Sequence, residues 1–181
     1  FIVNWANGFL RAWIIILLAG AMGCGHEASS QVGSRGVPLR QEAYVWNRNW
    51  EGSGFKPLSD VPEAVQGLGV LTAEVRWRLF RFEVVKIPTD FDQLKHCGRP
   101  VGLAIRMGNY PGPFRADDQA GKLLVDLAAG LVKEAEDNQC PLRELQIDFD
   151  CAESKLEGYR VWVEAMRKAV KPILVTFTAL P

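Results

Sequence analysis

The sequence has no excess of charge of either sign, because its 21 Lys and Arg residues balance 21 Asp and Glu residues. The basic stripe of a nucleic-acid-binding protein is therefore missing, and we expect no nucleic-acid partner. Histidine is scarce, with two residues in 181, and neither lies near a predicted strand, which disfavours a zinc site. The longest apolar run has about twelve residues, too few for a helix to cross a bilayer core of about 30 Å.

The rest of the composition is ordinary for a globular domain. Hydrophobic residues make up 48% of the chain and charged residues 23%, and 181 residues are enough for one domain with its own core. The sequence begins at Phe1 rather than Met, and its last residues fall at the end of a predicted strand. We therefore expect this sequence to be a fragment of a longer protein.

The N-terminal segment, residues 1–23, is predicted to be an export signal. Arg11 precedes an apolar run over residues 12–23 that has the length of a signal-peptide core and ends in small residues. Ordinary cleavage near this point and an uncleaved anchor are both compatible with the pattern. Residues 24–40 are rich in Gly, Ser and Gln and are predicted to form a flexible tether.

The residues Ala21-Met22-Gly23-Cys24 resemble the lipobox of bacterial lipoproteins. This resemblance implies that Cys24 becomes the mature N-terminus and carries lipid chains. Two or three acyl chains would attach an exported protein firmly to a membrane of the bacterial cell envelope.

Export makes the other cysteines informative, because exported proteins enter an oxidising compartment. Cys97 and Cys140 each precede a predicted strand, at the same end of neighbouring parallel strands. A Cys97–Cys140 disulfide is therefore expected, with three reduced thiols as the alternative. Cys151 falls at the opposite end of its strand, beside acidic residues.

Strand patterns alternate with helical patterns along the second part of the chain. The predicted strands cover residues 42–46, 69–77, 101–107, 144–151 and 173–179, and residues 80–86 are expected to pair with the second strand as a hairpin. Asp117 and Asp118 are predicted to open one longer helix, and a capping box at residues 154–157 is predicted to open another; shorter helices are expected near Asp60 and near Thr89 or Asp90. Helices that follow strands favour a parallel sheet.

Each predicted strand has one aliphatic side, and its other side mixes small and polar residues. On the second strand, for example, Leu71, Ala73 and Val75 are expected to oppose Thr72, Glu74 and Arg76. A doubly wound sheet needs two apolar faces, so this pattern predicts helices on one side only. We therefore expect residues 41–181 to form the N-terminal part of a TIM-type (β/α)8 barrel, truncated at the C-terminus after about five parallel strands.

The strand at residues 144–151 carries two carboxylates on its polar side. Asp148 and Asp150 lie roughly 6–7 Å apart along the strand, near its C-terminal end, where barrels build active sites. With Glu74 they are the candidate catalytic residues, because two like charges at close range favour one acid and one base. The alternative is structural: Arg106 pairs with Asp148, and Glu74 pairs with Arg76 or Arg106.

Aromatic residues lie close to these carboxylates in the predicted barrel. Tyr44 and Trp46 end the first strand, and Tyr110 lies in a loop after the third. Flat rings suit the apolar faces of sugars, so Tyr44, Trp46 and Tyr110 are candidate substrate-binding residues. Arg106, on the neighbouring strand, is the fourth candidate. Packing within the core is the alternative for each ring.

Several separated motifs resemble a bacterial family of exported proteins that is catalogued only as a domain of unknown function. They include Ile147-Asp148-Phe149-Asp150-Cys151, within a likeness that spans residues 42–181. The family is similar to barrel-fold glycoside hydrolases, so the resemblance implies a fold and a compartment but no known reaction. This sequence also resembles chitinase-type enzymes, more distantly. Asp148 and Asp150 match the last two aspartates of their strand motif, but Ala152 stands where those enzymes have the catalytic Glu.

Three functions follow from these patterns. The first is a glycoside hydrolase that acts on a polysaccharide. The second is a lipoprotein that binds a carbohydrate or cell-wall polymer without turnover. The third is a divalent-cation site in which Asp148 and Asp150 hold Mg²⁺ or Ca²⁺; no other cofactor is expected.

Overall fold

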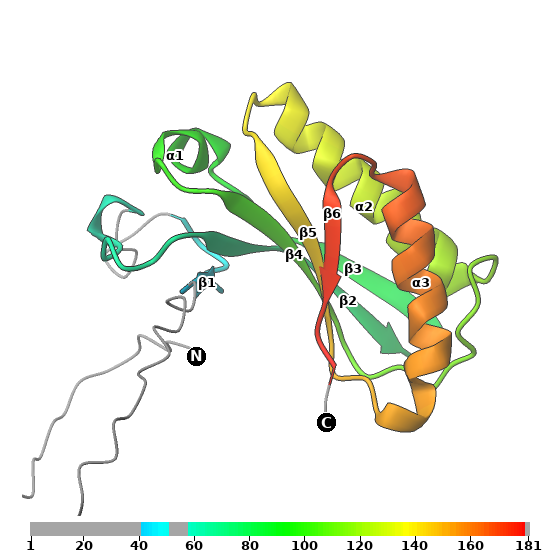
Figure 1. The fold of residues 1–181 in the computed structure, drawn as a ribbon. Coiled ribbons are helices and arrows are strands. Elements are labelled where there is room, and N and C mark those ends of the chain that lie inside the picture. The colour runs from blue at the N-terminus through cyan, green and yellow to red at the C-terminus, as the bar shows by residue number, and fades with distance from the viewer. Residues whose placement is uncertain (1–40, 51–57, 180–181) are drawn as a thin grey trace, which may run out of the picture. The chain divides into compact units, whose positions relative to one another are not determined.

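The computed structural model describes residues 41–50 and 58–179. The predicted signal, Cys24 and the tether lie outside the described residues. The described part forms one sheet with helices, shown in Figure 1.

The sheet has five parallel strands and one antiparallel strand. The parallel strands, in their order across the sheet, are β1 (Ala43–Val45), β2 (Leu68–Arg78), β4 (Val101–Met107), β5 (Leu142–Phe149) and β6 (Leu174–Phe177). The sixth strand, β3 (Arg81–Lys86), pairs antiparallel with β2 as the predicted hairpin. The structure therefore confirms an α/β fold with a mostly parallel sheet, close to the strand positions predicted from alternation.

The described residues contain three α-helices: α1 (Phe91–His96), α2 (Gln119–Asp137) and α3 (Leu156–Ala169). Two short 3₁₀ helices are also present, η1 (Leu58–Asp60) before β2 and η2 (Glu153–Lys155) directly before α3. The helix predicted to open at Asp117 and Asp118 is α2, and Asp118 is its N-cap, since its Oδ1 accepts a hydrogen bond from the Gly121 amide at 2.7 Å. The predicted capping box at residues 154–157 is wrong: η2 occupies this turn, and α3 begins at Leu156 without a side-chain cap.

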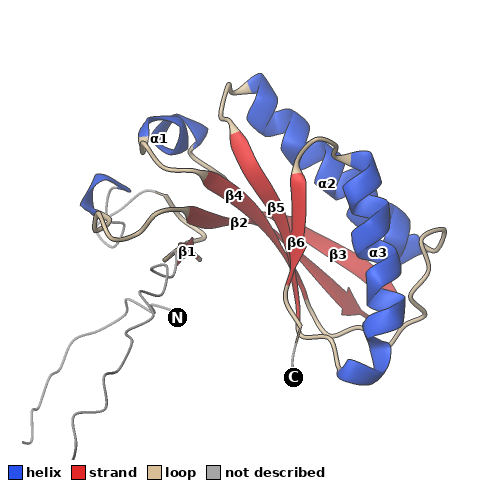
Figure 2. Ribbon diagram, in the orientation of Figure 1, coloured by secondary structure: helices blue, strands red, loops and turns tan. Residues whose placement is uncertain are grey.

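Both long helices lie on the same side of the sheet (Figure 2). Their buried side chains meet the aliphatic side of the strands in a single core that includes Leu124, Leu131, Trp162 and Met166. Trp162 is completely buried in α3, and its indole Nε1 donates to the Arg115 carbonyl at 3.2 Å. Helix cover on one side agrees with the prediction from the strand patterns.

One detail of the predicted strand faces is wrong. The register of β2 against β4 shifts between Leu71 and Ala73, because a β-bulge adds a residue to β2 at this point. Val70 therefore joins Ala73 in the helix-side core, whereas Leu71 pairs with Ala104 and lies outside that core. Simple alternation counted through the bulge had assigned Leu71 to the helix side.

The described residues form an open sheet rather than a closed cylinder. Within them, β1 pairs only with β2, and β6 pairs only with β5. We call the side of the sheet opposite to α2 and α3 the open face. Its polar residues on the central strands include Glu74, Arg106 and Asp148.

Candidate functional site

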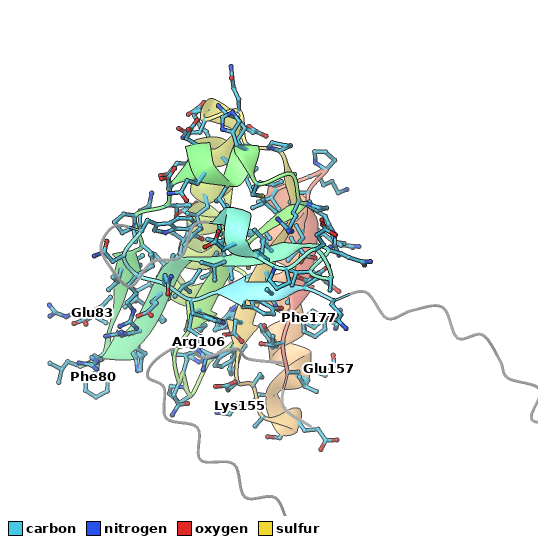
Figure 3. All side chains as sticks on the ribbon, turned by 90° about the vertical axis from the view of Figure 1, so that its left-hand side faces the viewer. Phe80, Glu83, Arg106, Lys155, Glu157 and Phe177 are labelled. Carbon is cyan, nitrogen blue, oxygen red and sulfur yellow. The ribbon has the colours of Figure 1, made fainter. Side chains whose placement is uncertain are left out.

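Three charged residues form one row across the open face. Glu74 of β2 is the register partner of Arg106 on β4, and Arg106 is the register partner of Asp148 on β5. We call Glu74, Arg106 and Asp148 the charged row. It lies toward the C-terminal ends of three parallel strands, where open α/β sheets and barrels place their ligands. Arg106 is labelled in Figure 3, which is turned toward the side away from the long helices.

Arg106 bridges the two predicted catalytic aspartates. Its Nη1 donates to Asp148, and its Nη2 donates to Asp150 Oδ2 at 2.6 Å. The hydrogen bond to Asp148 raises the pKa of Arg106 above its ordinary value, despite the opposing effect of burial. The alternative in which Arg106 pairs with Asp148 is thus the arrangement seen, and it extends to Asp150.

A hydroxyl group completes the surroundings of Asp148. Thr178 Oγ1 donates to Asp148 Oδ1 at 2.8 Å and accepts from the Phe149 amide at 3.0 Å. Both carboxylate oxygens of Asp148 therefore already accept a hydrogen bond, one from Thr178 and one from Arg106. No role was predicted for Thr178 from the sequence; its alternation with Thr176 at the end of the last predicted strand was the available signal.

Glu74 is also enclosed by arginines. Its contact with Arg76 confirms one of the two predicted partners, and the second arginine is Arg48. Glu74 Oε1 accepts from Arg48 Nε at 3.0 Å, and Glu74 Oε2 accepts from Arg76 Nη2 at 2.6 Å. Burial alone would raise the pKa of Glu74, but the hydrogen bonds and charges of Arg48 and Arg76 outweigh it, so the pKa is lowered. Arg48 follows β1 in a loop, and no sequence pattern had indicated its contact with Glu74.

These contacts give the open face a surface of arginines over buried carboxylates. The side chains of Arg48, Arg76 and Arg106 are 62%, 39% and 38% exposed, whereas those of Glu74 and Asp148 are 8% and 10% exposed. Each guanidinium carries five N–H donors, more than its carboxylate partners use. The exposed groups at the charged row are therefore mainly hydrogen-bond donors, with the half-exposed Asp150 as an acceptor beside them.

Tyr44 and Trp46 lie on the same side of β1 and extend the site along the sheet. Their rings are stacked, with centroids 6.0 Å apart and planes 22° apart. Tyr44 pairs with Gly69 and lies over it, since a Cβ on Gly69 would approach Tyr44 Cε1 to 2.8 Å. Gly69 pairs with Gly102, four residues before Arg106 on β4, so Tyr44 lies roughly 13 Å from the charged row along the strand direction. The rings and the row together form an elongated strip rather than one cluster.

Tyr110 is not part of this strip. It is only 4% exposed, and its ring contacts Trp77, Phe82, Phe114 and Trp162 in the helix-side core. Burial raises the pKa of its hydroxyl. The loop after β4 turns toward α3 and not toward the open face. Tyr110 therefore packs in the core, which was the alternative to its predicted role in substrate binding.

The predicted Cys97–Cys140 disulfide is not formed in the structure. Cys97, Cys140 and Cys151 are all free thiols, which is the alternative derived from the sequence. Cys140 and Cys151 are buried, and burial raises the pKa of both thiols. A raised pKa makes a thiol less nucleophilic at neutral pH, so neither cysteine has the properties of a catalytic nucleophile.

The two aspartates of the predicted cation site are both bound to one arginine. No group of three or more His, Cys, Asp or Glu residues with metal-binding geometry occurs among residues 41–50 and 58–179. Arg106 lies between Asp148 and Asp150, in the position where a shared cation would need to bind. A divalent ion at this point would have to displace a guanidinium that both carboxylates already bind.

A hollow elsewhere in the molecule has no comparable chemistry. It lies at the opposite end of β5 from the charged row, and its lining residues include Val132, Cys140, Leu142 and Ile173. The walls are mainly apolar, and Glu136 is their one charged residue among those described. The charged row, which contains buried ionisable groups, is therefore the stronger candidate for a functional site.

Comparison of the chain with protein-family models, with curated proteins and with solved structures found no significant match. Among the described residues, the helices are all too short or too polar to span a lipid bilayer. The candidate site therefore rests on the geometry of these residues alone.

Proposed function

We propose that this chain belongs to an exported bacterial lipoprotein with a partial (β/α)8 barrel, and that its open face binds a polysaccharide or cell-wall polymer. The single observation that carries this proposal is the strip that joins the stacked Tyr44 and Trp46 to the charged row. Its length suits a chain of sugar units better than a small, compact ligand.

The arginines supply hydrogen bonds for sugar oxygens. Two of them, Arg48 and Arg76, are held in place by the buried Glu74, and Arg106 is held by Asp148 and Asp150. Side chains fixed in this way lose little further conformational entropy when a ligand binds. Planar guanidinium groups also pair well with carboxylates, so acidic sugars are favoured over neutral ones.

The stacked rings supply the apolar contact. Tyr44 is more than one third exposed, and its ring packs against Gly69, where a larger residue would push it away. Sugar rings present C–H faces that pack against such surfaces, while their hydroxyls bind polar groups at the edge. Tyr44 and Trp46 would hold one part of the polymer and the arginines the next.

Binding is better supported than hydrolysis as the main activity. Glycoside hydrolysis needs a proton donor and a second carboxylate directed at the same bond. Asp148 has both oxygens engaged by Thr178 and Arg106, and Glu74 has both engaged by arginines. A substrate that reached either carboxylate would have to share or displace these hydrogen bonds.

Hydrolysis remains the second candidate because of one residue. Asp150 is half exposed and binds Arg106 through Oδ2 only, so Oδ1 is its remaining acceptor in this arrangement. An enzyme would use Asp150 at the bond and Asp148 to orient Arg106. In that case the loss of Asp150 would abolish turnover and leave most of the binding.

The test is calorimetric titration of the full chain with solubilised acidic and neutral polysaccharides, combined with an assay for released reducing ends. Trp46→Ala and Arg106→Met should each weaken binding by about tenfold or more, since each removes about 1.4 kcal/mol or more of contact. Arg160→Met is the matched control, because Arg160 is also an ion-paired arginine but lies on α3.

Equal affinities in the parent, Trp46→Ala and Arg106→Met would refute the sugar site. Release of reducing ends by the parent that disappears in Asp150→Asn would establish the hydrolase. Binding without any release would establish the binding protein.

A further inference from the structure

The turn between β2 and β3 exposes two large apolar side chains at the far end of a hairpin. Leu79 is 84% exposed and Phe80 is 91% exposed, the highest values among the large hydrophobic residues described. In Figure 3, Phe80 lies at the outer end of the hairpin and points away from the sheet. We call the four residues Arg78-Leu79-Phe80-Arg81 the hairpin tip.

The backbone of the tip is unfavourable for the residues it carries. Leu79 and Phe80 have φ values of 48° and 61°, in the left-handed region. Two-residue hairpin turns of this kind favour Asn-Gly or Asp-Gly, and other L-residues are disfavoured there. Neither local stability nor hydration accounts for Leu and Phe at these two positions, so an interaction at the tip is the remaining physical reason.

The hairpin holds these side chains firmly. Trp77 and Phe82 are register partners just behind the tip, and their rings pack with centroids 4.6 Å apart. Phe82 in turn contacts the buried Tyr110 at 5.2 Å between centroids, which joins the hairpin to the helix-side core. The two exposed apolar residues are thus presented on a supported projection.

Arginines surround the apolar end of the tip. Arg78 and Arg81 are register partners, so two like charges stand directly opposite each other, an arrangement that costs stability in a free hairpin. Arg81 has one weak ion pair, with Glu83 at 3.4 Å, in which both side chains are exposed. Arg78 has no acidic partner among residues 41–50 and 58–179. A negatively charged surface would relieve this repulsion.

We propose that the hairpin tip inserts into the surface of a lipid bilayer that contains anionic phospholipids. Leu79 and Phe80 enter the region between headgroups and acyl chains, while Arg78 and Arg81 bind phosphate groups at the surface. Apolar side chains flanked by arginines match this boundary, where long cationic side chains extend to the headgroups.

A protein partner fits the tip less well. Stable protein interfaces bury about 800 Å² on each partner and involve roughly 20–30 residues a side, far more than a two-residue projection offers. A sugar polymer would use the ring of Phe80 but would leave Leu79 without a favourable contact. We therefore assign the hairpin tip to lipid. The experiment below distinguishes lipid from a protein partner and from a sugar polymer.

Membrane contact at the tip would also fix the position of the charged row. The tip begins four residues after Glu74 on β2, roughly 13 Å along the strand. The charged row would therefore lie close to the bilayer surface. This inference does not depend on what the open face binds, since the two surfaces share no residue.

The experiment places an environment-sensitive fluorescent amino acid at position 80 of the full chain, with the same amino acid at Val85 as the control. Val85 lies on the same hairpin, on β3, and is also exposed. Vesicles of phosphatidylcholine alone are compared with vesicles that contain phosphatidylglycerol. The reporter at position 80 should shift to shorter wavelength and be quenched by brominated lipid on the anionic vesicles, whereas the reporter at position 85 should change little.

Charge variants test the role of the arginines. Arg78→Gln with Arg81→Gln should raise the concentration of anionic vesicles needed for a half-maximal shift by about thirtyfold, consistent with about 1 kcal/mol for each of the two basic residues near an anionic surface. Arg160→Gln, on α3, should leave the shift unchanged. Both variants should unfold at the same urea concentration as the parent, apart from a small gain in Arg78→Gln/Arg81→Gln from relief of the like charges.

Three results would overturn the proposal. The first is no shift at position 80, or an equal shift at position 85. The second is the same shift on addition of soluble polysaccharide without vesicles, which would assign Phe80 to sugar. The third is self-association of the parent in ultracentrifugation that Leu79→Ser/Phe80→Ser abolishes, which would assign the tip to a second copy of this chain.

Discussion

The two faces of the sheet are built from the same strands but are stabilised in different ways. The face under α2 and α3 is held by burial of aromatic and aliphatic groups, and two of its large rings donate to backbone carbonyls: Tyr159 to Ile147 at 3.0 Å and Trp162 to Arg115 at 3.2 Å. The open face is held by ion pairs of half-exposed arginines. Apolar burial alone would stabilise a sheet more simply than paired charges, so the charged row is better explained by a function.

The largest expected effect of a single substitution is on the helix-covered face. Trp162→Ala removes a completely buried ring and its hydrogen bond to Arg115, and it should lower the free energy of unfolding by about 3–5 kcal/mol. Urea denaturation of the full chain measures this loss. Val163→Ala, at the next and only partly buried position of α3, is the control and should cost much less. Similar losses in the two variants would show that the ring cluster is not the main source of stability.

An intermediate effect is expected on the open face. Arg106→Met leaves Asp148 buried with Thr178 as its remaining side-chain donor, and it should cost about 1–3 kcal/mol of unfolding free energy. Asp148→Asn added to this variant removes the uncompensated charge, so the double variant should lose less than the sum of the single losses.

The matched control for Arg106 is again Arg160 on α3. Its bond to Glu164 joins two exposed side chains, so Arg160→Met should change the unfolding free energy by less than about 0.5 kcal/mol. If Arg106→Met were as harmless as Arg160→Met, the charged row would not be a fixed arrangement.

A smaller effect is expected on the pH dependence of stability, because the open face contains the buried, ion-paired Glu74. Arg48 and Arg76 lower the pKa of Glu74 below its ordinary value of 4.5, so the unfolded chain binds this proton more readily than the folded one. The stability that Glu74 supplies is therefore complete above pH 4.5 and is lost as the pH falls through its lower folded pKa. Denaturation midpoints measured across this range should fall less steeply in Glu74→Gln than in the parent. Parallel curves would contradict the pairing of Glu74.

The sequence predicts the strands well because alternation is a local signal. The third predicted strand, residues 101–107, matches β4, and the N-terminus of α2 follows the capping side chain of Asp118. The one-sided placement of the long helices also follows from the difference between the two sides of each strand. These features depend on residues that are close together in the sequence.

The errors concern features that depend on distant residues. The bulge in β2 places Leu71 on the open face, and only the pairing with β4 reveals it. The loop of Tyr110 could turn to either face, and its packing against Trp162 decided the direction.

In the candidate site, too, contacts that follow from strand positions could be predicted, whereas contacts with distant loops could not. Asp148, Asp150 and Arg106 could be placed together from their strand positions, because neighbouring parallel strands align their C-terminal ends. Arg48 could not, because it reaches Glu74 from a loop 26 residues earlier. Tyr44 was placed on the correct side of β1, but its distance from Glu74 follows from the register with Gly69, which the sequence does not contain.

The most direct test of the polysaccharide site is a nuclear magnetic resonance titration that observes both faces in one spectrum. The arginine Nε–H signals of Arg48 and Arg106 and the indole signal of Trp46 report on the open face, and the indole signal of Trp162 reports on the helix-covered face. Addition of a soluble acidic polysaccharide should shift the first three signals at a common affinity and leave Trp162 unchanged. Shifts at Trp162 alone, or no shift at Trp46 and the two arginines, would contradict the assignment of the open face as the binding surface.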